Sequence, residues 1–101
     1  MKIAIDFDET ITEDPDFWSD FINLARRHFH EVTIVTYRRY DGDNQAIIDY
    51  ANDHNINVVY TAGVQKANVF KADVWIDDSP VTIPSKITLF NMYRGCKANG
   101  E

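Results

Sequence analysis

Short apolar runs alternate along the chain with longer amphipathic or polar stretches. Apolar runs rich in β-branched residues occupy positions 2–7, 32–36, 56–60, 73–77 and 86–90, and each has the length of a buried strand. Apolar side chains recur at helical spacing in two of the intervening stretches. This alternation predicts strands joined through helices, and therefore a parallel sheet with right-handed crossovers.

The two longer amphipathic stretches carry signals for where each helix begins or ends. Asp14 and Pro15 are typical of an N-cap and a first helical position, and His54 and Asn55 of a helix end. Residues 64–71 have room for one or two helical turns. The expected inner faces are Phe17, Trp18, Phe21, Ile22, Ala25 and Phe29 in the first helix, and Ala46, Ile47, Tyr50 and Ala51 in the second.

The pattern as a whole predicts one α/β domain of Rossmann-like architecture. We expect a central parallel five-stranded sheet in the order 3-2-1-4-5, with helices on both faces. The domain is expected over residues 1–93, followed by a polar C-terminal tail at 94–101. Residues 11–35 and 37–65 are used by the predicted elements, so neither interval has room for a cap domain with its own core.

Composition and charge narrow the classes of function. The chain has 101 residues and a net charge of −6, so its surface as a whole should repel nucleic acid and anionic lipid. A single cysteine, Cys96, cannot form an internal disulfide. The first apolar run is interrupted at Asp6, too early for a signal peptide, and no run has the length of a membrane span. These features predict a cytoplasmic protein without membrane association.

Polar residues of the kinds that bind ligands or take part in catalysis follow the predicted strands. In parallel sheets ligands bind outside the carboxyl ends of the strands, where the strand order reverses. If the first strand is central, the groups that converge there are Asp6, Asp8, Thr36, Arg38, Lys66, Asp77 and Asp78.

Four carboxylates in this set create an electrostatic problem. At separations of about 4–6 Å, each close pair would repel by roughly 4 kcal/mol at an effective dielectric constant near 20. Such groups either retain protons or share a cation. Oxygen ligands without His or Cys favour Mg²⁺. Taken singly, each of these residues is commonly a cap, a turn or a solvated side chain. Their joint occurrence at corresponding strand ends favours function.

The order of these groups resembles the haloacid dehalogenase-like superfamily of phosphatases and phosphotransferases. Its Asp-x-Asp-x-Thr motif is matched by residues 6–10, and the Thr that ends its second strand by Thr36. Lys66 fits its Lys or Arg motif, and Asp77-Asp78 its acidic pair. Two departures stand out. Glu9 occupies a position often held by Gly, and Lys71 competes with Lys66 for the basic motif.

The resemblance implies a mechanism of phosphomonoester hydrolysis. Asp6 would form an aspartyl-phosphate, and Asp8 would serve as general acid and base. Mg²⁺ would be held by Asp6, the backbone carbonyl of Asp8, and one or both of Asp77 and Asp78. Thr36 and Lys66 would stabilise charge on the phosphate oxygens. Arg38 could add a bidentate phosphate contact, or could be a solvated loop arginine.

Two alternatives belong to other classes. A response-regulator receiver domain is disfavoured, because it would carry its phosphoacceptor after strand three, where this chain has Tyr60. A catalytically weak binding module of the same scaffold, recognising a phosphorylated partner, stays open. The substrate is also open. A site without a cap favours a large substrate that covers it, such as a phosphoprotein or a nucleic-acid end, or a neighbouring subunit that does so.

Overall fold

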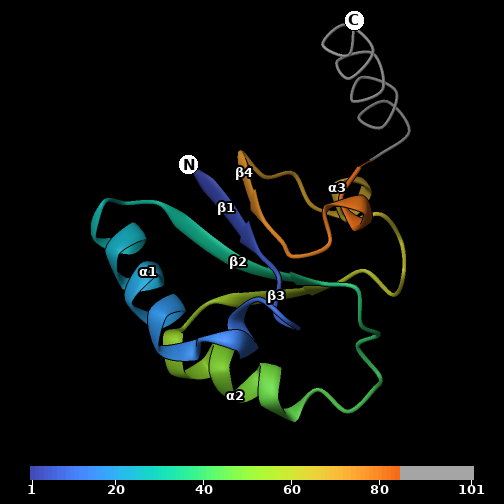
Figure 1. Ribbon diagram of the computed structural model, residues 1–101, viewed down its shortest axis with the longest axis horizontal. Coiled ribbons are helices and arrows are strands. Elements are labelled where there is room, and N and C mark those ends of the chain that lie inside the picture. The colour runs from blue at the N-terminus through green and yellow to red at the C-terminus, as the bar shows by residue number, and fades with distance from the viewer. Residues whose placement is uncertain (85–101) are drawn as a thin grey trace, which may run out of the picture.

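The computed structural model describes residues 1–84, which form an α/β fold with a parallel four-stranded sheet (Figure 1). The strands are β1 (Lys2–Ile5), β2 (Glu31–Thr36), β3 (Asn57–Tyr60) and β4 (Val74–Ile76). Their order is β3-β2-β1-β4, so β1 is central, as the sequence predicts. The predicted fifth strand at 86–90 and the tail at 94–101 lie outside the described residues.

Three helices and two short 3-10 turns connect the strands. They are α1 (Pro15–Arg27), α2 (Gln45–His54), α3 (Lys66–Val69), η1 (Ile11–Glu13) and η2 (Pro80–Thr82). The predicted cap of α1 is confirmed, because the Asp14 carboxylate accepts a hydrogen bond from the Phe17 backbone N–H at 3.2 Å. Asn55 ends α2 in the left-handed conformation, as expected. Among residues 1–84, no helix has the length and apolarity needed to cross a membrane.

The predicted inner face of α1 is wrong at both of its ends. Helix α1 stops at Arg27, and Phe29 lies beyond it with a positive φ of 65° and 95% of its surface exposed. The N–H of His30 then bonds to the carbonyl of Ala25, which closes the helix end. Phe17, in the first turn of the helix, is 55% exposed. Helical spacing identifies a face but does not show where the partner surface ends.

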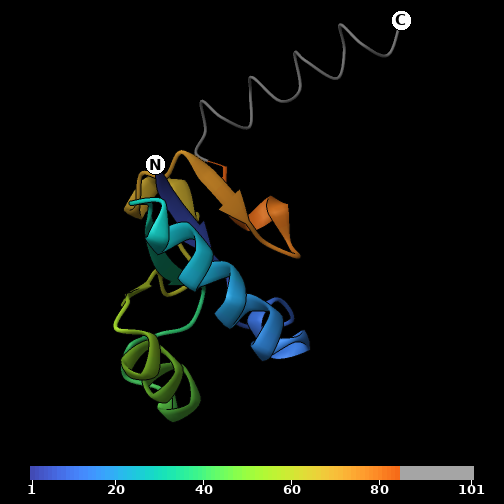
Figure 2. The same cartoon turned by 90° about the vertical axis from the view of Figure 1, so that its left-hand side faces the viewer.

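The hydrophobic core lies between the sheet and the two longer helices. Ile3 and Ile5 of β1 and Val32 and Ile34 of β2 project onto one face, where they join buried residues of α1 and α2 in one cluster. In Figure 2, helix α1 lies in front of the strands and α2 below it. The two longer helices therefore share one face of the sheet.

The second face of the sheet is also buried. Ala4 and Val35 point to it and are 0% and 1% exposed. A right-handed crossover from β3 back past β1 to β4 takes residues 61–73 across this face. This crossover carries α3, and it is the element that brings Lys66 to the carboxyl ends of the strands.

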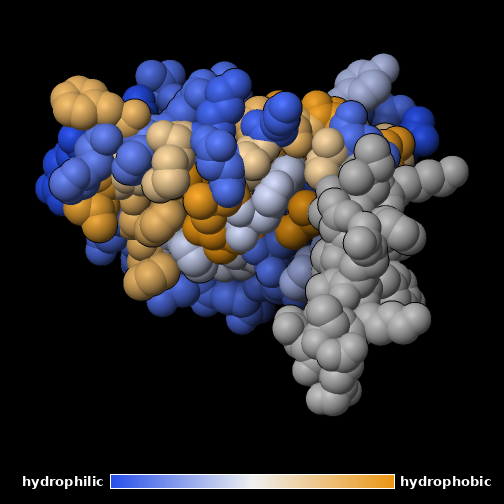
Figure 3. Space-filling view, turned by 90° about the horizontal axis from the view of Figure 1, so that it is seen from above, coloured by the Kyte–Doolittle hydropathy of each residue, from blue (hydrophilic) through white to orange (hydrophobic). Residues whose placement is uncertain are grey.

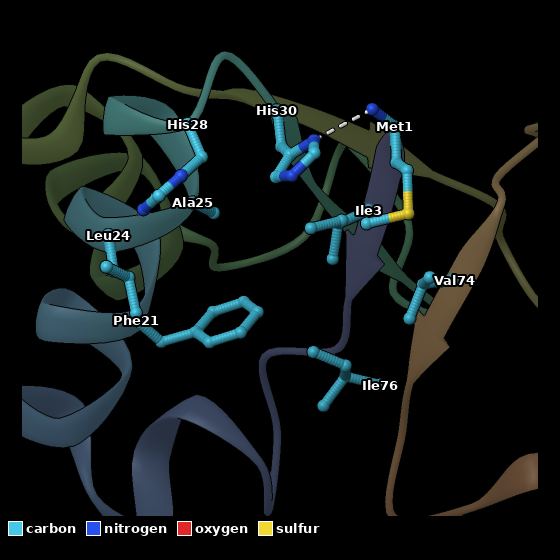
Figure 4. Close-up of a pocket in the computed structure, with 9 residues that line it drawn as sticks. All are labelled: Met1, Ile3, Phe21, Leu24, Ala25, His28, His30, Val74 and Ile76. Atoms are coloured by element: carbon cyan, nitrogen blue, oxygen red, sulfur yellow. Dashed lines mark hydrogen bonds between the residues drawn. The ribbon is translucent and has the colours of Figure 1, made fainter.

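An apolar groove lies at the opposite end of the sheet, where the strands begin. Seen from that end, apolar side chains are exposed between polar ones (Figure 3). A cavity of about 380 Å³ opens there between α1 and β4. In Figure 4, the ring of Phe21 points from α1 toward Ile76, and Met1 and Val74 border the same space. The groove contains none of the predicted site residues.

Candidate active site

Three carboxylates meet where β1 and β4 end. The N–H of Asp6 bonds to the carbonyl of Ile76 at 2.9 Å, which fixes the end of β1 against the end of β4. Asp6 follows β1 directly, and Asp77 and Asp78 follow β4. One carboxylate oxygen from each of the three lies within 4.8 Å of the others. The predicted convergence of these residues is therefore present in the fold.

A buried lysine joins two of these carboxylates. Lys66 begins α3 and is 2% exposed. Its Nζ lies 3.0 Å from Oδ1 of Asp6 and 2.5 Å from Oδ2 of Asp77. A lysine is almost never fully buried unless it is paired. The ammonium group thus acts as an internal counter-ion for the cluster.

Burial and the neighbouring charges shift the proton affinities of the cluster. Burial raises the pKa of Asp6 from 3.8 to about 6, and Lys66 opposes part of this rise. The pKa of Asp78 is lowered, chiefly because its carboxylate accepts a hydrogen bond from the Asp6 side chain. Without a cation, the cluster therefore binds a proton well above the ordinary range of an aspartate.

Asp8 lies beside the cluster and is paired with Arg38. Arg38 donates from Nε to Oδ2 of Asp8 at 2.8 Å and from Nη2 to Oδ1 at 2.6 Å. This two-point arrangement is the strong form of an arginine–carboxylate pair. The Asp8 side chain is not one of the three clustered carboxylates. Its sequence-predicted contact with a metal, through the backbone carbonyl, stays a prediction.

The two threonines that follow β2 and β3 are buried beside the site. Thr36 is 0% exposed, and its Oγ1 accepts a hydrogen bond from the Arg38 N–H at 3.3 Å. It does not line the cavity at the carboxylates. Thr61, which the sequence reasoning missed, is 4% exposed, and its Oγ1 has no hydrogen-bond partner among residues 1–84. Its N–H donates to the carbonyl of Thr36 at 2.9 Å, so the two strand ends are tied together.

The carboxylates border an open cavity of about 220 Å³. Of the residues that line it, Glu9, Tyr37 and Ser79 follow predicted strands but have no chemical role in the sequence argument, and Thr82 is missed altogether. Ser79 could have been found, because an Asp often bonds to the backbone two residues on, and the Ser79 N–H donates to Asp77 at 2.9 Å. Thr82 comes from η2, which gives no clear signal in the sequence.

The structure separates the two candidate lysines. Lys66 contacts the carboxylates, whereas Lys71 is exposed and lies with Met1, Lys2 and Asp73 at the end where the strands begin. The direction of the chain explains this difference, because Lys66 begins α3 and Lys71 follows it, on the segment that returns toward the start of β4.

The donor set suits a hard divalent cation. Asp6, Asp77 and Asp78 offer oxygen ligands alone, and no His or Cys belongs to this group in the described chain. Three carboxylates and one ammonium leave a formal charge of −2 at the site when all four are ionised. Oxygen donors in this number fit Mg²⁺ or Ca²⁺, and an open cavity beside them leaves room for water and a phosphate oxygen.

No family model, curated protein or solved structure matches this chain. The chemistry of the strand-end residues is therefore the basis for assigning a function.

Proposed function

We propose that this chain is a Mg²⁺-dependent phosphomonoesterase of the haloacid dehalogenase-like type. The observation that carries the proposal is the contact of buried Lys66 with Asp6 and Asp77 inside a cluster of three carboxylates. Structural ion pairs seldom gather three acids and a buried lysine beside an open cavity. The pattern fits a site that holds a cation and a phosphate together.

The proposal extends to the fold and the location of the chain. Residues 86–90 would add a fifth strand beside β4 and give the order 3-2-1-4-5 within one Rossmann-like domain. The observed order β3-β2-β1-β4 supports this arrangement, because it leaves the far edge of β4 free among the described residues. The chain would act in the cytoplasm.

Asp6 is the nucleophile in this proposal. A carboxylate oxygen of Asp6 attacks phosphorus, the bond from phosphorus to the ester oxygen breaks, and Asp8 gives its proton to that oxygen. Water then attacks the phosphorus of the aspartyl-phosphate and passes a proton to Asp8. The bond to Asp6 breaks, which releases inorganic phosphate and restores both carboxyl groups.

The remaining site residues would neutralise the charge of the phosphate or hold the reacting groups in position. Lys66 fixes Oδ1 of Asp6 and presents a cation to the phosphate oxygens. Asp6, Asp77 and Asp78 would hold Mg²⁺, which when bound would neutralise charge on the phosphoryl group. Thr36 would support phosphate binding by fixing the backbone of Arg38, to which its hydroxyl is bonded.

The open site bears on the class of substrate. Residues 11–30 contain η1 and α1, and residues 37–65 contain a loop, α2 and β3, so in the described chain nothing folds over the cavity as a domain. The cavity of about 220 Å³ is open and has room for a phosphoryl group, but it does not enclose the remainder of an ester. We infer a terminal phosphate on a macromolecule, a phosphoprotein or a nucleic-acid end, as the physiological substrate.

Hydrolysis of an aryl phosphate tests the proposal. The wild type should turn it over with Mg²⁺ and stop when the metal is chelated. Asp6→Asn should lose essentially all activity, because an amide is not a nucleophile at phosphorus. Asp20→Asn, on the exposed side of α1, is the matched control and should keep full activity. Wild-type turnover by Asp6→Asn would refute the mechanism. Phosphate binding without turnover by the wild type would favour the binding-module alternative.

A further inference from the structure

The Arg38–Asp8 pair is asymmetric in how its two partners are held. The guanidinium of Arg38 also donates to the carbonyl of Asp43 at 3.1 Å and lies 5.9 Å from the centroid of the Phe7 ring. Its Nη1 is 3.5 Å from Oδ1 of Asn44. The Asp8 carboxylate, by contrast, has no hydrogen bond other than those from Arg38 among residues 1–84. Arg38 is the anchored partner, and Asp8 is the one free to turn.

The loop that carries Arg38 is itself braced. Asn44 is 4% exposed and occupies the N-cap position of α2, but its side chain does not cap the helix. Its Nδ2 donates instead to the carbonyl of Arg39 at 2.7 Å. A buried polar side chain thus forgoes the usual cap bond and holds the loop in place. The guanidinium fork is preorganised before any ligand arrives.

The Arg38–Asp8 pair lies where a phosphate can replace the Asp8 carboxylate as the partner of Arg38. Side chains of Arg38 and Asp8 are 35% and 45% exposed, and ion pairs in such surroundings contribute little net stability. The ion pair of Lys66 with Asp6 differs, because the Lys66 side chain is only 2% exposed and its contact is held in the interior. Phosphate oxygens accept the same two-point fork as a carboxylate and carry more negative charge. Asp8 lines the cavity beside the three carboxylates and Arg38 does not, so a phosphoryl group in the cavity would meet the fork only in the place that Asp8 occupies.

We propose that the Asp8 carboxylate is a placeholder for the substrate phosphate in front of Arg38. In the free protein Asp8 occupies the fork with both oxygens. When a phosphoryl group enters, its oxygens replace the carboxylate, Arg38 stays in place, and Asp8 turns to the ester oxygen. This inference rests on the proposed phosphatase function, and it adds that the acid–base group is released only when phosphate is bound.

A double-mutant cycle on the affinity for inorganic phosphate, measured by calorimetry with Mg²⁺ present, tests the exchange. Arg38→Met should weaken phosphate binding about tenfold or more, the loss of a charged hydrogen-bonding partner. Asp8→Ala should strengthen it by up to about fivefold, because the competitor for the fork is gone. In the Arg38→Met background, Asp8→Ala should give little of this gain. Arg38→Lys, which keeps the charge, should recover part of the affinity.

The neighbouring Arg39–Asp41 pair is a matched control. It lies on the same loop, with Nε and Nη2 of Arg39 at 3.1 and 3.3 Å from the two oxygens of Asp41, and it does not border the cavity. Arg39→Met and Asp41→Ala make the same charge changes and should leave phosphate affinity nearly unchanged. The Nε–H signal of Arg38 in nitrogen–proton NMR spectra, assigned by its loss in Arg38→Lys, should shift when phosphate is added.

The outcomes separate this inference from the proposed function. If Asp8→Ala tightens phosphate binding equally with and without Arg38, Asp8 opposes phosphate through its charge alone and the placeholder is refuted. Turnover by the wild type that is lost in Asp6→Asn would, in that case, leave the phosphatase proposal standing. A wild type that neither binds inorganic phosphate nor hydrolyses the ester overturns both.

Discussion

Removal of the Lys66 charge should destabilise the metal-free protein. Lys66→Met keeps a side chain of similar length but leaves Asp6 and Asp77 without their cation, at contacts of 3.0 and 2.5 Å from the lost Nζ. Breaking a buried ion pair by removing one partner costs about 3–5 kcal/mol. Asp6 limits this loss because it can bind a proton. Lys66 lowers the pKa of Asp6, so removal of Lys66 raises that pKa above about 6, and protonation at pH 7.5 then costs no more than about 2 kcal/mol. We therefore expect Lys66→Met to lose about 2–3 kcal/mol at pH 7.5.

Urea unfolding in the presence of a chelator measures this loss. Lys71→Met is the matched control, since Lys71 is exposed, and its unfolding free energy should stay within about 0.5 kcal/mol of the wild type. The deficit of Lys66→Met should shrink toward pH 5, where Asp6 is protonated in the folded state. Saturating Mg²⁺ should also shrink it, because the metal takes over part of the neutralisation.

The reasoning fails if Lys66→Met and Lys71→Met unfold alike at pH 7.5 without metal. It also fails if the deficit of Lys66→Met is the same at pH 5 and at pH 7.5. Either result would mean that the ammonium group does not neutralise the carboxylates in solution.

Three further predictions follow from the same group of residues. Because the pKa of Asp6 rises from 3.8 to about 6 on folding, the folded state binds the extra proton between these values. The metal-free wild type should therefore lose stability relative to Asp6→Asn as pH rises from about 4 to 6, by up to about 3 kcal/mol, and an absent slope would contradict the shift. Glu9 has a φ of 60°, which glycine adopts without strain, and Asp78 raises the pKa of Glu9. Glu9→Gly should therefore raise the melting temperature more than Glu9→Gln does, and equal effects would show that charge, not backbone, is decisive. Saturating Mg²⁺ should raise the melting temperature of the wild type, and Asp78→Asn should weaken that response, which calorimetric scans with Mg²⁺ and with chelator would check.

Much of the fold could be predicted from the sequence, because the sequence signals for strands and helix ends are local. The apolar run before Asp6, the cap at Asp14 and the left-handed residue at Asn55 each depend on a few neighbouring residues. The exposure of Phe17 and Phe29 could not be predicted in this way, because it depends on the packing of the first turn of α1 and on where that helix ends. A periodic pattern contains no information on the extent of the surface that it faces.

The site shows the same division between local and long-range information. The rule that ligands bind at the carboxyl ends of parallel strands brought Asp6, Asp77 and Asp78 together from sequence alone. The sequence argument required a proton or a cation to relieve their repulsion. The fold supplies a cation as the ammonium of Lys66, and the raised pKa of Asp6 allows it to bind a proton below about pH 6. The pairing of Asp8 with Arg38 was missed, since it depends on how the loop after β2 is folded.

The contact between Lys66 and Asp6 joins residues that are far apart in the sequence, so they are synthesised at different times. Asp6 leaves the ribosome early, and the ammonium group that it needs lies 60 positions later in the chain. Until β4 has followed α3 out of the exit tunnel, the nascent chain holds β1 with an unmatched acid at its end. Domains generally complete their folding as units during synthesis, and here Lys66, from a late element of the described fold, neutralises Asp6, which follows the first strand. Ribosome-stalled chains that stop before residue 77 has emerged should therefore be more open to proteases than chains stalled further on.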